Sequence, residues 1–411
     1  MSQRTRRGPR KVSRDETCRH TYQGYRFIKG IRKLLARLAS HKDCANRLLH
    51  YDEYATLLLF YFFNANITSL RGLRSSTEFE KVRKKLGIKR TSLGSLSEAS
   101  NVFDPALLRE VFLELSGQAA ASDALPRPES LPKHLDFIVS DGSVLEGVPR
   151  MVWALWLRSH DTGVKVHLDY DVLRGVPTDV DFTVGCGSET ESLRSRLEAN
   201  KLYVLDRGYA DYGFFQCVLD AKSSLLCRVQ SNAVCNTIEE RAVSDEARAL
   251  GVQSDEIVML GGKKSGKKLT RPVRVVKATI TNKPSRSLRP YRRRVSSRKC
   301  FRTTSQTHEL VLATDLLDVP AEMIVELYRH RWQVELFFKW LKCTLSCRHL
   351  IAESPEGVAM QVYAALIVSL LIVLWTGKKP TKRTLEMLQM YFQGWVSEQE
   401  FDAHIEKLKA A

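Results

Sequence analysis

The sequence lacks the features that would assign the chain to a membrane, to secretion or to a zinc site. Its longest apolar stretch, residues 362–375, is shorter than the about 20 residues that span a bilayer, so we expect a buried helix. The basic N-terminus leads into no apolar secretory segment. The 9 cysteines form no paired C-x2-C framework, and Cys343, Cys347 and His349 lack a second ligand pair. We expect a reduced cytoplasmic protein without structural zinc or a membrane partner.

A nucleotide-binding loop is also missing. Residues 261–268 fit the pattern G-x4-G-K, but Lys268 stands where a Ser or Thr would hold magnesium. The segment also does not join a clear strand to a helix. A turn rich in Gly and Lys is the better interpretation, and we expect no nucleotide cofactor.

Acidic residues are absent from residues 263–302, which contain 16 Lys or Arg. The whole chain has 64 Lys plus Arg against 46 Asp plus Glu, a formal net charge of +18, so this segment carries most of the excess. Such a balance favours an anionic polymer, although charge alone does not distinguish DNA, RNA and an anionic membrane. Arg292, Arg293 and Arg294 are its densest cations. A disordered loop is the alternative, but Val273 to Ile280 alternates as a strand does.

The chain has 411 residues, enough for several domains. A helical region comes first, in which Asp104 and Pro105 open a helix, and short strands and helices then alternate. The expected parts are a basic arm (1–25), a helical domain (26–118), a Pro-containing linker (119–134), the first part of an α/β core (135–231), a basic β-rich insertion (232–305), the second part of the core (306–375) and a helical tail (376–411).

Two short apolar segments each end in an aspartate followed by a glycine turn. One runs from Leu135 to Asp141, and the other runs from Leu202 to Asp206. Both are typical of buried strands, and open α/β sheets form their sites at the carboxyl ends of strands. A single Asp in this position is usually a turn former, but two of them suggest a pair of catalytic acids.

A third acid lies on a predicted helix near the C-terminal end of the core. Tyr328, Arg331, Glu335 and Lys342 are spaced by 3, 4 and 7 residues, so an α-helix places them on one narrow stripe. A carboxylate beside cations and a phenol suits phosphodiester chemistry, because it can hold a metal ion while its neighbours bind phosphate. A solvated helix face is the alternative.

Together these segments resemble the DDE transposases of bacterial insertion sequences, and within them the insertion-sequence-four family. The resemblance rests on Asp141, Asp206 and Glu335, with Y-x2-R-x3-E-x6-K around the glutamate, and covers about residues 55–375. It implies a ribonuclease-H-like catalytic core with a β-rich insertion, preceded by an all-helical DNA-binding domain. It also implies that the three acids hold two magnesium ions, with manganese as a substitute, and that the enzyme cuts and pastes DNA.

The resemblance extends to partners and to further residues. It implies that Tyr328, Arg331 and Lys342 contact DNA phosphates, that Trp332 is a candidate to stack on a displaced base, and that Arg292 to Arg294 lie in the DNA-binding insertion. A core position is the alternative for Trp332. The expected partners are double-stranded DNA, as element ends and target, and a second copy of the chain in a dimer on DNA, in the bacterial cytoplasm at the nucleoid.

Several alternatives remain open from the sequence. Other acids on neighbouring strands could replace the chosen ones, namely Asp169, Asp171, Asp179, Asp181 and Asp211. The same residues would serve a nuclease that cuts DNA without joining it. An inactive DNA-binding remnant of a transposase is the third possibility.

Overall fold

The computed structural model describes residues 24–40, 47–147, 151–154, 163–233, 235–261, 269–281, 307–347 and 349–410. Within these ranges the chain divides into two compact units. A helical unit comprises Met1–Ala124, Leu145–Val164 and Lys339–Ala411, and a sheet unit comprises Leu125–Val144 and Lys165–Phe338. The chain is therefore of mixed α/β class.

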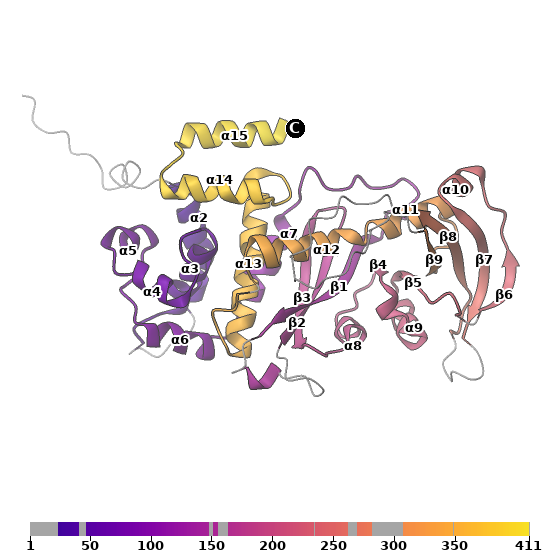
Figure 1. Ribbon diagram of the computed structural model, residues 1–411, viewed down its shortest axis with the longest axis horizontal. Helices are drawn as coiled ribbons and strands as arrows, with labels where there is room; N and C mark the ends of the chain where they lie inside the picture. The colour runs from indigo at the N-terminus through magenta and orange to yellow at the C-terminus, as the bar shows by residue number, and fades with distance from the viewer. Residues whose placement is uncertain are drawn as a thin grey trace, which may run out of the picture. The chain divides into compact units, whose positions relative to one another are not determined.

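The sheet unit is built on one large mixed sheet, whose nine described strands follow the order β3-β2-β1-β4-β5-β9-β8-β7-β6 (Figure 1). β4 lies between β1 and β5 and is parallel to both, whereas β5, β9, β8, β7 and β6 pair antiparallel. The strands are β1 (Asp136–Glu146), β2 (Gly163–Asp171), β3 (Val176–Val184), β4 (Lys201–Leu205), β5 (Ser224–Arg228), β6 (Cys235–Glu240), β7 (Val252–Leu260), β8 (Val273–Thr281) and β9 (Thr307–Thr314).

Strands β6, β7 and β8 arise from the segment predicted as a β-rich insertion, and they extend the same sheet beyond β9. The predicted strand at Val273 is confirmed as β8. Its Arg274 is buried and makes a bidentate ion pair with Asp255 on β7, with both nitrogen-to-oxygen distances at 2.7 Å. Lys277 of β8 pairs with Glu256. These two cations of the basic segment therefore hold the sheet together.

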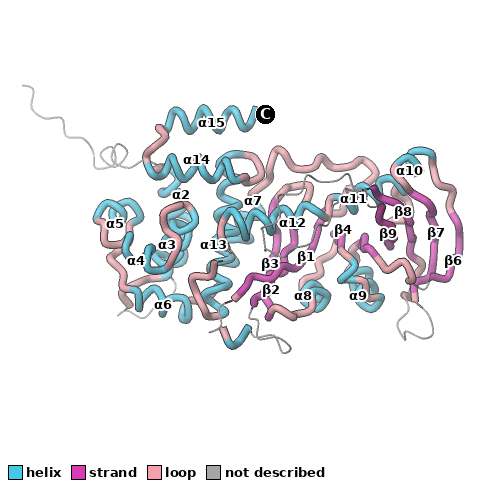
Figure 2. Tube along the Cα trace, viewed as in Figure 1, coloured by secondary structure: helices cyan, strands magenta, loops and turns pink. Residues whose placement is uncertain are grey.

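Helices cover both faces of this sheet, as Figure 2 shows. Ile138 and Tyr203 point to one face, where they join a buried cluster with residues of α8 and α9. Phe137 points to the opposite face, where its ring centre lies 6.2 Å from that of His330, between α11 and α12. The helices of this unit are α8 (Glu189–Arg194), α9 (Tyr212–Asp220), α10 (Asp245–Ala249), α11 (Ala321–Arg329) and α12 (Trp332–Lys339).

The helical unit combines the N-terminal helices with the C-terminal ones. The predicted start of α7 is confirmed, since Asp104 accepts a hydrogen bond from the backbone N–H of Ala106 and Pro105 lies in the first turn. The helices are α2 (Tyr25–Leu35), α3 (Tyr51–Phe62), α4 (Leu70–Ser76), α5 (Glu80–Leu86), α6 (Leu93–Val102), α7 (Pro105–Gln118), α13 (Pro355–Thr376), α14 (Lys382–Gln393) and α15 (Glu398–Ala410).

Helix α13 is the core helix of this unit. It has 22 residues, more than the apolar stretch predicted from the sequence, and it is the one helix among the described residues that is long and apolar enough to cross a membrane. However, 94% of its apolar window is buried inside the protein. The predicted buried helix is therefore confirmed.

The aromatic residues of the C-terminal tail divide into two groups. Tyr391 and Phe401 are buried and stack with ring centres 4.5 Å apart, and Phe27 of α2 packs edge-on against both. Trp395 is 79% exposed. Most of the tail's aromatic surface is therefore used within the helical unit itself.

Candidate catalytic site

The two predicted aspartates lie at the same edge of the sheet. Val139 of β1 pairs with Val204 of the parallel strand β4, and Asp141 and Asp206 each come two residues later. The local backbone differs between them: β4 ends at Leu205 and a turn follows Asp206 as predicted, whereas β1 continues through Asp141 and Gly142 to Glu146, so the Gly turn predicted after Asp141 is wrong. Oδ1 of Asp141 accepts a hydrogen bond from the N–H of Gly142 at 2.8 Å, and Oδ1 of Asp206 accepts one from Gly208 at 2.7 Å. The register of two parallel strands thus brings together acids that are far apart in sequence.

The segment that carries the third acid is not the single α-helix that the spacing predicts. Helix α11 ends at Arg329 and α12 begins at Trp332, and the N–H of Arg331 bonds to the carbonyl of Tyr328 at 3.0 Å in the turn between them. After α12 the chain forms a π-helical turn, Trp340–Thr344. The tighter turn before α12 and the wider one after it shift residues relative to an ideal α-helical stripe.

Arg331 contacts two of the predicted catalytic acids. Its Nη2 lies 2.5 Å from Oε1 of Glu335, and its Nη1 lies 3.8 Å from Oδ2 of Asp141. The Arg331 side chain is 17% exposed, so these charges interact in a partly desolvated setting. The expected association of Arg331 and Glu335 is present, and Arg331 connects Glu335 to the edge where Asp141 lies.

Tyr328 is also part of this group. Its side chain is buried, and burial raises the pKa of its hydroxyl to about 12. The charge of Arg331 acts in the opposite direction, and a negative charge on Asp206 adds a smaller increase to the Tyr328 pKa. The phenol therefore remains protonated at neutral pH and is a hydrogen-bond donor beside both a cation and a carboxylate.

The ionisation of Asp141 reflects the charges around it. Burial raises its pKa from 3.8 to about 6. The Gly142 hydrogen bond and Arg331 lower the Asp141 pKa, whereas the negative charges of Asp206 and Glu189 raise it. Like charges that are held together in this way attract a cation, so the edge is electrostatically prepared for one.

The structure places the remaining predicted DNA-binding residues in different settings. Lys342 lies in the π-helical turn, beyond the end of α12. Trp332 is 56% exposed, so the alternative of a core aromatic is wrong and its indole face is open to a ligand. Arg292, Arg293 and Arg294 lie outside the described residues, as does most of the basic arm 1–25.

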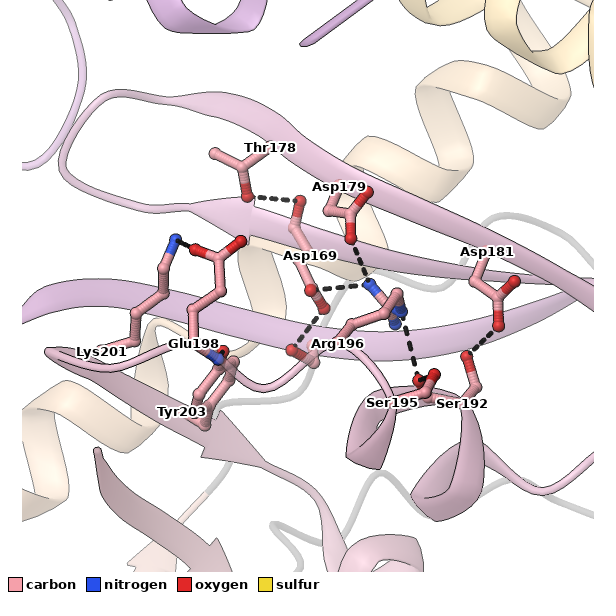
Figure 3. Close-up of polar contacts among 11 residues, drawn as sticks. Asp169, Thr178, Asp179, Asp181, Ser192, Ser195, Arg196, Glu198, Lys201 and Tyr203 are labelled. Atoms are coloured by element: carbon pink, nitrogen blue, oxygen red, sulfur yellow. Dashed lines mark hydrogen bonds and ion pairs between the residues drawn. The ribbon is translucent and has the colours of Figure 1, made fainter. Parts of the chain in front are cut away.

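The alternative acids on β2 and β3 have structural partners. Buried Asp169 receives hydrogen bonds from the Ser140 hydroxyl at 2.6 Å and from Nη1 of Arg196 at 2.7 Å, and Arg196 also reaches Asp179 at 3.4 Å. Figure 3 shows Arg196 between these two carboxylates. Since Ser140 immediately precedes Asp141, this network fixes the strand that carries the catalytic acid.

The remaining alternative acids shape turns and helix ends. Asp181 accepts a hydrogen bond from the Ser192 hydroxyl (Figure 3). Asp171 accepts backbone N–H groups in the turn after β2, and Asp211 caps α9. Asp206 has the same kind of capping role as Asp211, so what distinguishes Asp141 and Asp206 is that the neighbouring parallel strands β1 and β4 bring them together.

Glu189 is an acid of this edge that the sequence did not indicate. It begins α8, its Oε1 lies 2.6 Å from Nζ of Lys165 on β2, and its carboxylate lies beside Gly142 and Gly208, which follow the two aspartates. No motif marks it, because its proximity to Asp141 depends on how α8 packs on the sheet. The pattern of strand, helix and strand before Asp206 was the one available signal.

The donor chemistry of the edge fits a hard divalent cation, because its acids offer carboxylate oxygens only. The negative charge of Asp206 raises the pKa of Asp141, and Glu335 is engaged by Arg331. Among the described residues no three His, Cys, Asp or Glu side chains are already gathered to hold a metal ion. To bind the same metal ion as the two aspartates, the Glu335 carboxylate would have to break its ion pair with Arg331.

Comparison with known proteins identifies the family. The family model described as the transposase DDE domain matches residues 135–371, more than half of the chain. The chain therefore belongs to the DDE transposase family, whose members are generally dependent on divalent metal ions and act on DNA. It is an enzyme of the class that cleaves DNA and transfers strands.

Curated relatives carry names of the same kind. A protein of Sinorhizobium fredii (strain NBRC 101917 / NGR234) named as transposase y4zB is 27% identical over 53% of this chain, and the match spans 55% of its own length. A protein of Synechocystis sp. named as the transposase for insertion sequence element IS4SA is 21% identical over 84% of this chain and 90% of its own. One from Geobacillus stearothermophilus, named for element IS5377, is 24% identical over 62% of each chain. Among solved structures, a piggyBac transposase synaptic complex with hairpin DNA aligns with 98% of this chain and 88% of that chain, at 11% identity and a TM-score of 0.38.

Proposed function

We propose that this chain is the transposase of a bacterial insertion sequence of the insertion-sequence-four type. It would bind the terminal inverted repeats of its element, cut the DNA there and join the ends to target DNA. The observation that carries the proposal is the arrangement of Asp141 and Asp206 at one sheet edge, with Arg331 contacting both Asp141 and Glu335. Family membership and the names of the relatives support it.

The catalytic core would be ribonuclease-H-like, with Asp141 and Asp206 on its central parallel strands. The sheet order supports this proposal, because β1 and β4 are neighbours and β4 continues in parallel to β5. Strands β6 to β8 would be the insertion between the second and third acids. The helical domain, residues 26–118, would recognise the element ends.

Asp141, Asp206 and Glu335 would hold two magnesium ions, for which manganese could substitute. When bound, such ions activate the attacking oxygen and neutralise charge on the reacting phosphate. The protein's own cations then have a separate task. Arg331 would grip a phosphate by its planar fork once Glu335 is released, and Lys342 would act as a point charge. Protonated Tyr328 would donate a hydrogen bond to a phosphate oxygen, and Trp332 offers an exposed face for base stacking.

The three acids can be tested separately from DNA binding. Replacing Asp141, Asp206 or Glu335 by Ala should reduce cleavage of an end-bearing DNA about a thousandfold or more, because several kcal/mol of charge stabilisation is lost. End affinity in a gel-shift assay should stay within about threefold, since the cations supply most of that affinity. Asp220→Ala, an exposed acid at the end of α9, is the matched control and should retain full cleavage.

The same assay separates the alternatives. Cleavage of terminal repeats without strand joining would favour the nuclease, and binding without cleavage would favour the inactive remnant. Near-normal cleavage by the Asp206→Ala protein would show that the second acid is wrongly assigned.

A further inference from the structure

Lys165 and Glu189 form an ion pair directly beside the predicted catalytic edge. Nζ of Lys165 lies 2.6 Å from Oε1 of Glu189, and the two side chains are 17% and 20% exposed. Lys165 also donates to the carbonyl of Gly187 at 3.3 Å, in the turn that leads into α8. This pair is therefore more buried than an ordinary surface pair, and water screens its charges less.

The pair packs against the residue that follows the first predicted catalytic acid within strand β1. A Cβ added to Gly142 would lie 2.7 Å from Oε1 of Glu189 and 2.8 Å from Cε of Lys165, so a larger residue would displace the ion pair. Gly142 has no left-handed backbone conformation that would otherwise require glycine. Close approach of the ion pair is thus the feature that favours Gly after Asp141.

The same carboxylate reaches the turn after the second acid. A Cβ on Gly208 would lie 3.4 Å from Oε2 of Glu189, whereas Oε1 faces Gly142. Gly142 and Gly208 are the residues whose N–H groups bond to the carboxylates of Asp141 and Asp206. One side chain therefore lies beside both of the glycines whose N–H groups orient the predicted catalytic acids.

We propose that Lys165 and Glu189 are a positioning pair for the metal-binding aspartates. Glu189 packs against Gly142 and Gly208, and Lys165 balances its charge so that the edge binds a divalent cation neither too weakly nor too tightly. The proposal rests on the proposed metal-dependent function of Asp141 and Asp206. It adds two residues that act through those acids.

Because Glu189 and Lys165 carry opposite charges, neutralising one or the other should change the affinity for a divalent cation in opposite directions. Glu189→Gln leaves the Lys165 ammonium uncompensated beside the aspartates and should weaken cation binding about tenfold, because charges several ångströms apart interact strongly in a partly buried site. Lys165→Met leaves the Glu189 carboxylate uncompensated and should strengthen cation binding by a similar factor. The double variant restores the net charge and should return to within about threefold of wild type.

The test uses the full-length protein without DNA. Manganese binding is measured by titration calorimetry for wild type, both single variants and the double variant, and thermal unfolding is recorded for each of them. The magnesium concentration that gives half of the maximal DNA cleavage rate should rise for Glu189→Gln and fall for Lys165→Met. Glu191→Gln is the matched control, since Glu191 lies in the same turn of α8 but pairs with Arg194 at the surface, and it should leave both quantities unchanged.

Each outcome distinguishes this inference from the proposed function. Equal weakening by both single variants would indicate a merely structural pair and would overturn the inference, as would wild-type binding in all of them. Asp141→Asn is included as a reference. If Asp141→Asn binds manganese like wild type, the proposed metal site is wrong and the inference falls with it. If Asp141→Asn loses binding while the Lys165 and Glu189 variants behave as wild type, only the inference is wrong.

Discussion

Nη2 of Arg331 lies 2.5 Å from Oε1 of Glu335, so the cation and the carboxylate of the same signature neutralise each other in this structure. The other guanidinium nitrogen lies 3.8 Å from Asp141. Arg331 therefore occupies the electrostatic position that a bound cation would take between these two acids. Arg331 would have two alternative roles. It would pair with the acids before a metal binds, and it would bind a DNA phosphate afterwards.

Arg331→Met should separate these two tasks. Removing a positive charge that lies 2.5 Å from the carboxylate of Glu335 and 3.8 Å from that of Asp141 should tighten manganese binding at least about threefold in the absence of DNA. The single-turnover cleavage rate at saturating metal should nevertheless fall, because the variant cannot bind the phosphate through a guanidinium. Calorimetry and single-turnover kinetics measure the two effects. Exposed Arg329→Met serves as the control, and weaker metal binding by Arg331→Met would show that Arg331 organises the acids instead of opposing a cation.

The raised pKa of Asp141 predicts that this acid destabilises the metal-free fold at neutral pH. An acid whose pKa is higher in the folded than in the unfolded chain opposes folding when it is ionised, and the penalty vanishes once both states are protonated. With a shift from 3.8 to about 6, the penalty is fully present above about pH 6 and is lost below about pH 4. Asp141→Asn removes the charge at almost constant size.

In the presence of a chelator at pH 7.5, Asp141→Asn should raise the free energy of unfolding by about 3 kcal/mol. Near pH 4 the two proteins should have equal stability. Denaturant titrations at both pH values measure this difference. A variant less stable than wild type at pH 7.5 would mean that the Arg331 contact outweighs the burial of the Asp141 charge.

The buried pair of Arg196 and Asp169 should be important for folding rather than for chemistry. The Arg196 and Asp169 side chains are 11% and 6% exposed, and Arg196→Met would leave Asp169 with an uncompensated buried charge. We expect a loss of about 3–5 kcal/mol in the free energy of unfolding. Arg194→Met, at the end of α8 two residues before Arg196, breaks only the exposed pair with Glu191 and should cost less than about 1 kcal/mol. Equal losses for both variants would contradict the structural role of the Asp169 network.

The cations of the basic segment should fall into two classes. Neutralising Arg292, Arg293 and Arg294 should weaken binding to all DNA sequences and reduce the log–log salt slope by about 0.9 for each DNA phosphate that the variant no longer neutralises. Arg274→Met should instead destabilise the protein, because Arg274 is buried against Asp255. Gel shifts over a range of salt concentrations and thermal unfolding separate the two classes. An unchanged salt slope in the triple variant would show that these arginines do not form a DNA surface.

The sequence was sufficient to predict those parts of the fold that depend on residues close together in the chain. The apolar run that ends in Asp206 correctly predicted a strand followed by a turn, because such turns depend on neighbouring residues. The same pattern at Asp141 predicted the strand but not its end, since β1 continues to Glu146. The same reasoning could not predict the break before α12, since neither Gly nor Pro marks His330 and Arg331. Glu189 was missed because its place at the edge depends on long-range packing of α8.

The active assembly should be a dimer that forms on DNA. Two element ends must be cut and joined together, so each end needs an active site, and the family resemblance implies that a subunit can act on the end bound by its partner. In the C-terminal tail, Trp395 is 79% exposed and Met390 is 48% exposed, which leaves apolar surface for a second copy of the chain. Tyr391 and Phe401 are already buried within the helical unit and are not candidates.

Mixing two defective proteins tests action in trans. One carries Asp141→Ala, and the other carries substitutions that neutralise the Arg and Lys residues of α4 and α5, in the helical domain proposed to bind the element ends, so that end binding is lost. The first subunit can bind the element ends but cannot cleave them, whereas the second has an intact catalytic site but cannot bind the ends. Cleavage restored only in the mixture, together with a two-subunit complex in sizing experiments on DNA, is the expected result. A single subunit that fully cleaves one end in isolation would contradict it, because a complete site would then need no partner.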